Sequence, residues 1–232
     1  MSWMKRYKKK FDIFKVILEK EDPIIVEIGA HYGEDSVRFT ETFEKSTIYC
    51  FEPDPRNIAI FKKHVDNSRI KLFECALSNE EGTAEFFQSY QDYAKEQVPD
   101  KYDWISKEDY EKHKLNNSGS SSLKKGYQHT LNETITVQTK RFDNWMVEND
   151  ISQIDLAWID VQGAEAMVIE GMGNEIYNVG FIWIEYGELN YEGGLSRADT
   201  ITLLAAKGFK PLKDFHNTTT TGDLLFYNTS RK

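Results

Sequence analysis

Short apolar runs alternate along the chain with segments of helical periodicity, and this alternation constrains the fold more than any other feature. The apolar runs have the length of buried strands and occupy residues 24–28, 47–51, 70–75, 154–159 and 179–185. Segments with apolar residues at helical spacing lie at residues 11–20, 36–43, 56–65, 142–149, 164–170 and 197–207. This pattern predicts βαβ crossovers and a doubly wound α/β fold. Residues 209–212 and 224–227 would close the sheet as an antiparallel hairpin, giving seven mostly parallel strands.

The regular alternation is interrupted by an insertion after the third strand. Residues 83–87 and 134–140 look like paired strands, and a polar segment at residues 88–132 lies between them. A connection of this length is usually a lid or a binding loop, and a loosely ordered decoration is the alternative. We therefore expect a single domain over residues 1–232, with an N-terminal helix within residues 1–22 and an inserted lid or acceptor-binding segment at 88–132.

Composition narrows the class of partner. The 232 residues are 40% hydrophobic and 29% charged, which is typical of a globular chain. The formal net charge of −9 gives no broad basic face, so a nucleic-acid partner is not expected. No apolar run has the length of a membrane span, and no signal-peptide core follows the basic N-terminus. Cys50 and Cys75 suit a reducing compartment, so a cytoplasmic location is predicted. The oligomeric state stays open, with a homodimer as one alternative.

The turn after the first predicted strand has the features of a ligand-binding loop. Gly29 lets the backbone turn without a Cβ clash, and Gly33 permits close packing where the helix begins. A dinucleotide-binding G-x-G-x-x-G loop would need glycine where His31 stands. Glu27, inside the strand, is unfavourable beside a pyrophosphate but suits a ligand with an ammonium and a sulfonium group. S-adenosylmethionine carries both groups, so the turn favours this cofactor.

The next two strand ends add contacts for a nucleoside. Glu52 ends the second strand and is followed by Pro53, at the place where an acid binds ribose hydroxyls in nucleoside-binding α/β folds. Ala76, Leu77 and Ser78 follow the third strand, where small and polar residues suit an adenine pocket. The alternatives are a solvated loop acid at Glu52 and an ordinary strand-to-turn transition at 76–78.

Together with the run Ile159-Asp160-Val161-Gln162-Gly163-Ala164-Glu165, these segments resemble the FkbM family of methyltransferases. In that family the first strand leads into an acid-x-Gly-Ala-Asn-x-x-Gly turn. The second strand ends in Glu-Pro, and a late strand reads Lys-Ile-Asp-Val-Glu-Gly-Ala-Glu. The resemblance covers roughly residues 24–87 and 134–227. It implies a Rossmann-like class I methyltransferase fold, S-adenosylmethionine as donor, and methylation of a hydroxyl group.

The resemblance also bears on the acceptor. Acceptors in such families include sugars and polyketide natural products, and a sugar is our expectation for this chain. Such enzymes need no metal as a rule, although some sugar O-methyltransferases use magnesium, and no residue spacing here indicates a metal site. Three residues depart from the pattern: His31 replaces an Asn, Gln162 a Glu and Trp158 the strand Lys. The loss of the Lys affects the acceptor more than the fold.

Methyl transfer to an alcohol needs alignment of the reacting atoms and a base for the hydroxyl proton. Asp160, at the end of the fourth parallel strand, is the first candidate, and Glu185 on the neighbouring strand could hold the acceptor. Asp160 could instead orient the methionine ammonium, and Glu185 could face water.

Further residues are candidates for the site. Glu165 is either a site residue or a charge at a helix start. Ser122, in a Ser-Ser-Leu element that also resembles the family, is expected to close over the cofactor. His31, His113, His129 and His216 are other candidate bases.

Two rival functions remain at this stage. One is an NAD-dependent Rossmann oxidoreductase or epimerase, against which His31 and the absence of an evident Tyr-x-x-x-Lys pair count. The other is a non-catalytic module that binds S-adenosylmethionine, which the Trp158 departure favours. Acids at the ends of several strands favour a working enzyme.

Overall fold

A computed structural model describes residues 3–90, 98, 102, 104–127, 131–216, 218 and 220–231. Its main sheet has seven strands in the order β3-β2-β1-β7-β8-β10-β9. Five neighbouring strands are parallel, and β10 is antiparallel to both β8 and β9. The predicted fold class is thereby confirmed. The strands are β1 (Ile24–Ile28), β2 (Thr47–Phe51), β3 (Ile70–Phe73), β7 (Ile154–Ile159), β8 (Val179–Gly187), β9 (Phe209–His216) and β10 (Thr221–Asn228).

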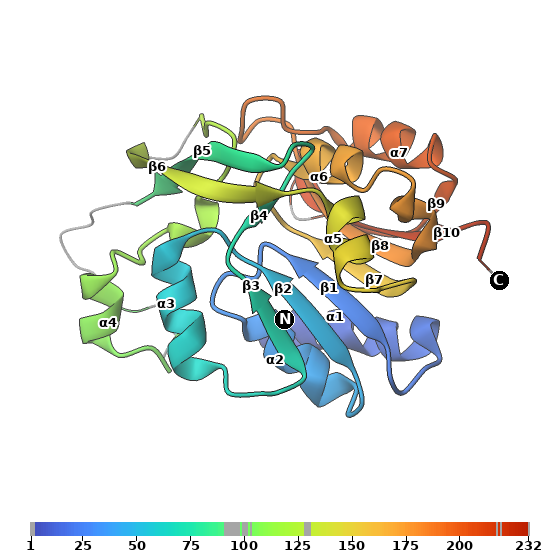
Figure 1. Ribbon diagram of the computed structural model, residues 1–232, viewed down its shortest axis with the longest axis horizontal. Coiled ribbons are helices and arrows are strands. Elements are labelled where there is room, and N and C mark those ends of the chain that lie inside the picture. The colour runs from blue at the N-terminus through green and yellow to red at the C-terminus, as the bar shows by residue number, and fades with distance from the viewer. Residues whose placement is uncertain are drawn as a thin grey trace.

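Helices cover both faces of this sheet, as a doubly wound fold requires (Figure 1). Apolar residues of α1 (Trp3–Leu18), α2 (Glu34–Thr42) and α3 (Pro55–His64) pack in one core cluster. Those of α5 (Phe142–Glu148), α6 (Glu165–Gly171) and α7 (Arg197–Ala205) pack in the other. The sheet therefore separates two hydrophobic cores. Because both faces are covered, a ligand can reach the sheet only at the ends of its strands.

The helix starts follow local capping chemistry. Asp54 caps α3 because its carboxylate accepts the backbone N–H of Arg56 at 3.0 Å, and Pro55 occupies the first helical position. Helix α2 begins at Glu34, two residues before the predicted start at 36, because Gly33 in a left-handed conformation (φ 84°) ends the turn there. Both helices thus begin directly after a strand-end turn, and their first residues reach the same edge of the sheet.

The third strand is shorter than predicted. It ends at Phe73 and not at 75, because the chain leaves β2 and continues as β4 (Ala76–Leu77) in a second sheet. That sheet has the order β4-β6-β5, with β5 at Gly82–Ser89 and β6 at Leu131–Lys140. The antiparallel pairing of β5 with β6 confirms the predicted partnership of 83–87 with 134–140.

The inserted segment between β5 and β6 contains a short helix, α4 (Lys107–Lys112), and the 3-10 turn η2 (Ser118–Ser120). In Figure 1, β5 and β6 run side by side across the top of the view, and α4 lies near α3 at its left. A further 3-10 turn, η3 (Glu175–Asn178), precedes β8. The insert is therefore placed at the same end of the molecule as the first turn of α3.

An aromatic stack lies between α1 and the middle of the sheet. Trp158 of β7 and Trp183 of β8 have ring centroids 4.8 Å apart and planes only 3° from parallel. Phe14 of α1 meets both rings edge-on, at 5.9 and 5.6 Å. Aromatic pairs of this kind add to the stability that simple burial gives. The indole at 158, where the family pattern has a lysine, thus packs in this hydrophobic core.

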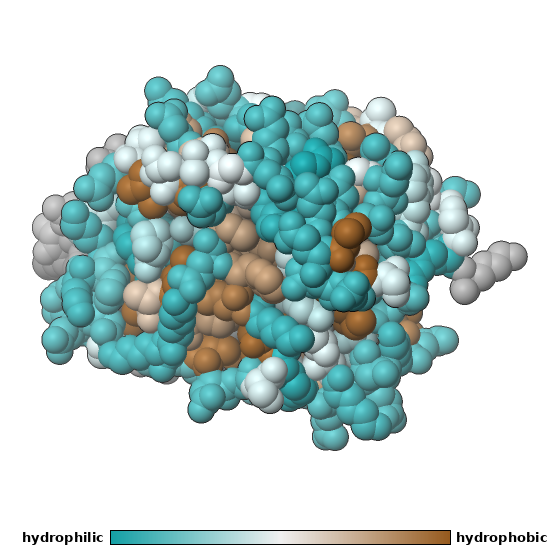
Figure 2. Space-filling view, viewed as in Figure 1, coloured by the Kyte–Doolittle hydropathy of each residue, from teal (hydrophilic) through white to brown (hydrophobic). Residues whose placement is uncertain are grey.

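Figure 2 shows a mostly hydrophilic face, with apolar surface near its centre over the region of β2 and β3. Tyr49 of β2 and Phe73 of β3 are only partly buried, and both pack against the core on that side. Among the described residues, no helix combines the length and the apolar character needed to cross a membrane.

Candidate active site

A cavity of about 540 Å³ lies at the carboxyl ends of β1, β2 and β7, the edge where open α/β sheets bind ligands. Its wall comes from the turns after these strands, from β4 with Phe86 of β5, and from residues 115–121 of the insert. Eight of the predicted cofactor-binding residues line it: Glu27, Gly29, His31, Glu52, Pro53, Ala76, Leu77 and Asp160. The topology thus brings residues from four separate segments of the chain to one cavity.

Three predicted cofactor contacts and one predicted catalytic residue lie behind this wall. A Cβ on Gly33 would stand 2.7 Å from the Phe61 ring, so this glycine serves helix packing. Ser78 is buried, and its backbone N–H donates to the Lys140 carbonyl at 2.9 Å. Ser122 Oγ donates to the Val161 carbonyl at 3.2 Å. Glu185 does not line the cavity, and its Oε2 accepts from Nε2 of the wall residue Gln162 at 2.8 Å. Direct ligand contacts by these four residues stay predictions.

Gly29 is the tightest point of the first turn. It has a φ of 91°, and a Cβ built on it would lie 1.9 Å from the backbone oxygen of Asp160. The N–H groups of Gly29 and Ala30 both donate to the Phe51 carbonyl at 3.0 Å. The β1 turn is therefore fixed against β2 on one side and β7 on the other, and only glycine fits there.

Glu52 is held rigidly at the end of β2. One carboxylate oxygen accepts the His31 N–H at 2.8 Å, and the other accepts the Asp54 N–H at 2.8 Å. The side chain is only 4% exposed. Burial, and then the neighbouring Asp54, raise the pKa of Glu52 to about 7, against the opposing effect of its hydrogen bonds.

This shifted pKa predicts a pH dependence of stability. In the unfolded chain the carboxyl group ionises near 4.5, and in the folded protein its pKa is about 7. The native state therefore holds more protons between these values, and Glu52 costs stability as pH rises through this window. The cost levels off above about pH 7, at about 3 kcal/mol. We expect Glu52→Gln to flatten the fall in unfolding free energy across this window in urea titrations. Glu85→Gln, on the exposed face of β5, is the matched control, and equal slopes in both variants would contradict the assignment.

The cavity is strongly acidic. Glu27, Glu34, Asp35, Glu52 and Asp160 line it, and its described lining residues include no lysine or arginine. Burial raises the pKa of Glu27 well above its usual range, and the negative charge of Asp35 adds to this effect. The hydroxyl of Ser36 donates to Glu27 and opposes the shift. Such a cavity favours a cationic ligand and disfavours a pyrophosphate.

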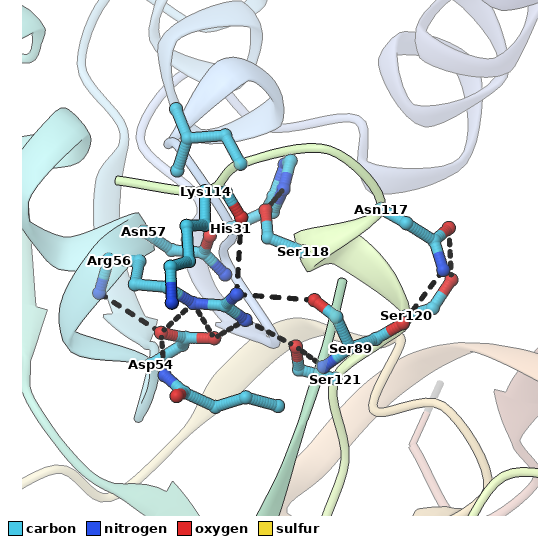
Figure 3. A network of polar contacts seen from close by, with 12 residues as sticks. His31, Asp54, Arg56, Asn57, Ser89, Lys114, Asn117, Ser118, Ser120 and Ser121 are labelled. Carbon is cyan, nitrogen blue, oxygen red and sulfur yellow. Dashed lines mark hydrogen bonds and ion pairs between the residues drawn. The ribbon is translucent and has the colours of Figure 1, made fainter. Parts of the chain in front are cut away.

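The insert is fastened to the cavity by the network drawn in Figure 3. Arg56, in the first turn of α3, pairs with the fully buried carboxylate of Asp54 at 2.6 Å. The same guanidinium donates to the Lys114 carbonyl at 3.2 Å and to Ser121 Oγ at 3.0 Å. It also donates to the Ser89 carbonyl at 3.2 Å. One side chain thus joins α3, the end of β5 and both ends of the segment 114–121.

We expect Arg56→Ala to lower the free energy of unfolding by about 3 kcal/mol, because it leaves the buried Asp54 carboxylate without its cation. Lys45→Ala is the control. It breaks an ion pair with Glu21 in which both side chains are well exposed, and should leave the free energy of unfolding almost unchanged. Urea unfolding of the two variants provides the comparison. Similar losses would show that the Arg56 network contributes little.

A second set of contacts holds the η2 turn over the first loop. His31 contacts Glu34 through Nδ1 at 3.0 Å and Ser118 Oγ through Nε2 at 3.3 Å. The Tyr32 hydroxyl lies 2.7 Å from the same serine oxygen. His31, which stands where the family pattern has Asn, therefore bridges the turn after β1 and the insert.

Of the other candidate bases, His113 does not line the cavity, while His129 and the side chain of His216 lie outside the described residues.

Sequence reasoning missed several wall residues. Glu34 and Asp35 follow Gly33 directly, so two acids in the first turn of a helix that begins at the loop were an available signal. Tyr32 also lies within that loop. For Asn117 and Ser118 no local signal exists, because their position depends on contacts with residues far away in the chain.

Glu165, considered as a site residue, accepts the Gly163 N–H at 3.0 Å and supports the β7 turn.

Comparison with known proteins agrees with this geometry. The family model described as the methyltransferase FkbM domain matches residues 27–211, which span every strand-end turn of the cavity. The chain belongs to this family. It is 34% identical over 215 residues to the 2-O-methyltransferase NoeI of Sinorhizobium fredii, and the alignment covers 92% of this chain and 82% of NoeI. Methyltransferase 1 of Beauveria bassiana is 24% identical over 82% of this chain and 73% of its own length.

Among solved structures, Aeropyrum pernix fibrillarin with natively bound S-adenosyl-L-methionine aligns at a TM-score of 0.49 and 13% identity. The alignment covers 89% of this chain and 67% of the fibrillarin chain.

The membership in the FkbM family confirms the predicted enzyme class and cofactor: the protein is an S-adenosylmethionine-dependent methyltransferase. The NAD-dependent alternative is thereby set aside.

The residues of this FkbM domain fit the cofactor. The acids at Glu27, Asp35 and Asp160 suit its ammonium and sulfonium charges. Glu52, fixed by two backbone N–H groups, presents a carboxylate for ribose hydroxyls. Ala76, Leu77, Phe86 and Leu123 give an apolar part of the wall that suits adenine. These individual roles are predictions from the chemistry of the wall. Among the described residues, no group of three or more His, Cys, Asp or Glu side chains could hold a metal ion.

Proposed function

We propose that this methyltransferase methylates a hydroxyl oxygen of a sugar, as a small molecule or within a glycan, with Asp160 as general base. The observation that carries the proposal is the position of Asp160. It directly follows β7 and lines the cavity beside the β1 turn, and the side chain of Gln162 joins it to Glu185 of β8. The similarity to an enzyme named 2-O-methyltransferase supports oxygen as the acceptor atom.

The cofactor, when bound, would supply a methyl group on its sulfonium, which the acceptor oxygen attacks in line while the S–CH₃ bond breaks and the sulfur leaves as a neutral thioether. The protein must then align the acceptor and remove its hydroxyl proton. Asp160 takes this proton, so that the O–H bond breaks as the new O–CH₃ bond forms. The side chain of Glu185 lies behind Gln162, where it can support Asp160 or hold the acceptor.

The insert supplies the features that favour a sugar. Residues 116–118, 120 and 121 of the insert are all Asn or Ser, and they line the cavity together with Tyr102. Sugars have apolar ring faces and polar edges, and such side chains match both. We therefore propose that the insert covers the cavity, excludes water and binds the acceptor.

The experiment is a methyl-transfer assay with isotopically labelled S-adenosylmethionine and acceptors of three classes: monosaccharides and oligosaccharides, phenols, and carboxylic acids. The proposal expects label on sugars as a methyl ether, which resists mild base. Label in a base-labile ester, or on phenols alone, would overturn the sugar assignment. Binding of the cofactor with no transfer to any class would favour a non-catalytic module.

A further inference from the structure

The side chain of Gln162 connects the two predicted catalytic carboxyl groups. Its Nε2 donates to Asp160 Oδ1 and, at 2.8 Å, to Glu185 Oε2. Its Oε1 accepts from the Tyr191 hydroxyl at 2.9 Å. Because carboxylates accept at one end of the amide and a hydroxyl donates at the other, this network fixes which way the amide points. Gln162 therefore joins the ends of β7 and β8 with one neutral group.

The backbone around Gln162 is shaped for this role. Gln162 itself has a φ of 55°, a conformation that costs energy for any residue other than glycine. A Cβ on the next residue, Gly163, would lie 2.3 Å from Cβ of Tyr191, so the turn packs directly on this tyrosine. The Tyr191 hydroxyl also lies 3.0 Å from the Ser120 carbonyl of the insert. The amide is thus supported by Tyr191 in the loop after β8, and the same tyrosine contacts Ser120 of the insert.

The surroundings of the carboxyl pair are negative. Asp160 and Glu185 are faced by Glu165 from α6, Asp223 from β10 and Glu27 from β1, together with the phenol of Tyr191. Burial, and then the charge of Asp160, raise the pKa of Glu185 well above its usual range. A glutamate at 162, the residue of the family pattern, would add a further negative charge at this point and remove both N–H donors.

We propose that Gln162 is a positioning residue that aims Asp160 at the acceptor and, as a neutral double donor, places no further negative charge between Asp160 and Glu185. This inference rests on the proposed function, in which Asp160 takes the hydroxyl proton. It predicts that the charge of residue 162, and not only its size, sets the pH range in which the enzyme works. A purely structural role would change stability or cofactor binding without moving the pH profile.

The test compares Gln162→Glu with Gln138→Glu, the same change on an exposed residue of β6. In Gln162→Glu we expect the acid limb of the kcat profile to move to higher pH by about one unit, and the rate near neutral pH to fall about tenfold. The dissociation constant for S-adenosylhomocysteine should stay within a few-fold of wild type. Tyr191→Phe, which frees the amide, should shift the limb in the same direction by less. A rate loss without a shift in the limb would overturn the proposal.

A second readout needs no acceptor. In protein labelled with carbon-13 at aspartate carboxyl groups and saturated with S-adenosylhomocysteine, the Asp160 resonance is the one that Asp160→Asn removes. Its titration midpoint should rise in Gln162→Glu and stay unchanged in Gln138→Glu. An unchanged midpoint in both variants would overturn the inference even if no sugar is methylated. A raised midpoint without methyl transfer would instead contradict only the proposed function.

Discussion

Gly29→Ala is expected to lower the affinity for S-adenosylhomocysteine by at least about 100-fold and the free energy of unfolding by about 3 kcal/mol. The new Cβ would lie 1.9 Å from the Asp160 backbone oxygen, and the backbone of residue 29 has a φ of 91°. Neither group can move freely, because the Gly29 N–H is bonded to Phe51 and the Asp160 N–H donates to the Ile28 carbonyl. The β1 and β7 turns would therefore separate, and both carry residues that line the cavity.

The control for this variant is Gly193→Ala. Gly193 also has a positive φ, 74°, but a Cβ there meets nothing within 4 Å. It should pay only the conformational cost of about 1 kcal/mol and leave cofactor affinity unchanged. Calorimetric titration and urea unfolding measure the two effects. Equal behaviour of the two alanine variants would show that the close approach of the β1 and β7 turns is unimportant.

Asp160→Asn is expected to lower the rate of methyl transfer by about 10² to 10⁴-fold, the usual range for the loss of a general base. The amide keeps the shape of the side chain and can still accept a hydrogen bond from Gln162, so the site should remain assembled. The affinity for S-adenosylhomocysteine should change by less than about tenfold. Single-turnover rates and calorimetric titration of the same preparation provide the two values.

This prediction separates the two roles considered for Asp160. If the carboxylate only orients the cofactor ammonium, affinity falls at least as much as rate, and the base assignment is wrong. Asp150→Asn, an exposed residue after α5, is the isosteric control and should change neither value.

The sheet could be predicted from the sequence because its signals are local. The strands at 24–28, 47–51 and 154–159 have the predicted bounds, since each is an apolar run that ends at a turn residue. The predicted ligand loop also lies at the cavity, because in a parallel sheet the carboxyl ends of neighbouring strands must meet at one edge. Gly29 and Glu52 were therefore accessible from the sequence alone.

The contacts that hold residues 114–121 at the cavity could not be predicted in this way. The segment 114–121 is held by Arg56, whose acceptors Lys114 and Ser121 are 58 and 65 residues away in the chain. Polar contacts over such separations follow no periodicity, so a sequence pattern does not report them. The contact between Gln162 and Glu185 depends likewise on the pairing of β7 with β8. The environment of Trp158 likewise depends on residues far away in the chain, among them Phe14 of α1 and Trp183 of β8.

This acid-lined cavity is expected to bind S-adenosylmethionine through Glu52 at the end of β2. The decisive measurement is calorimetric titration with S-adenosylmethionine, S-adenosylhomocysteine and NAD, on the wild type and on Glu52→Ala. We expect the first two ligands to bind to the wild type, Glu52→Ala to weaken both by about tenfold or more, and NAD not to bind. Binding of NAD, or affinity for S-adenosylmethionine that Glu52→Ala leaves unchanged, would contradict it.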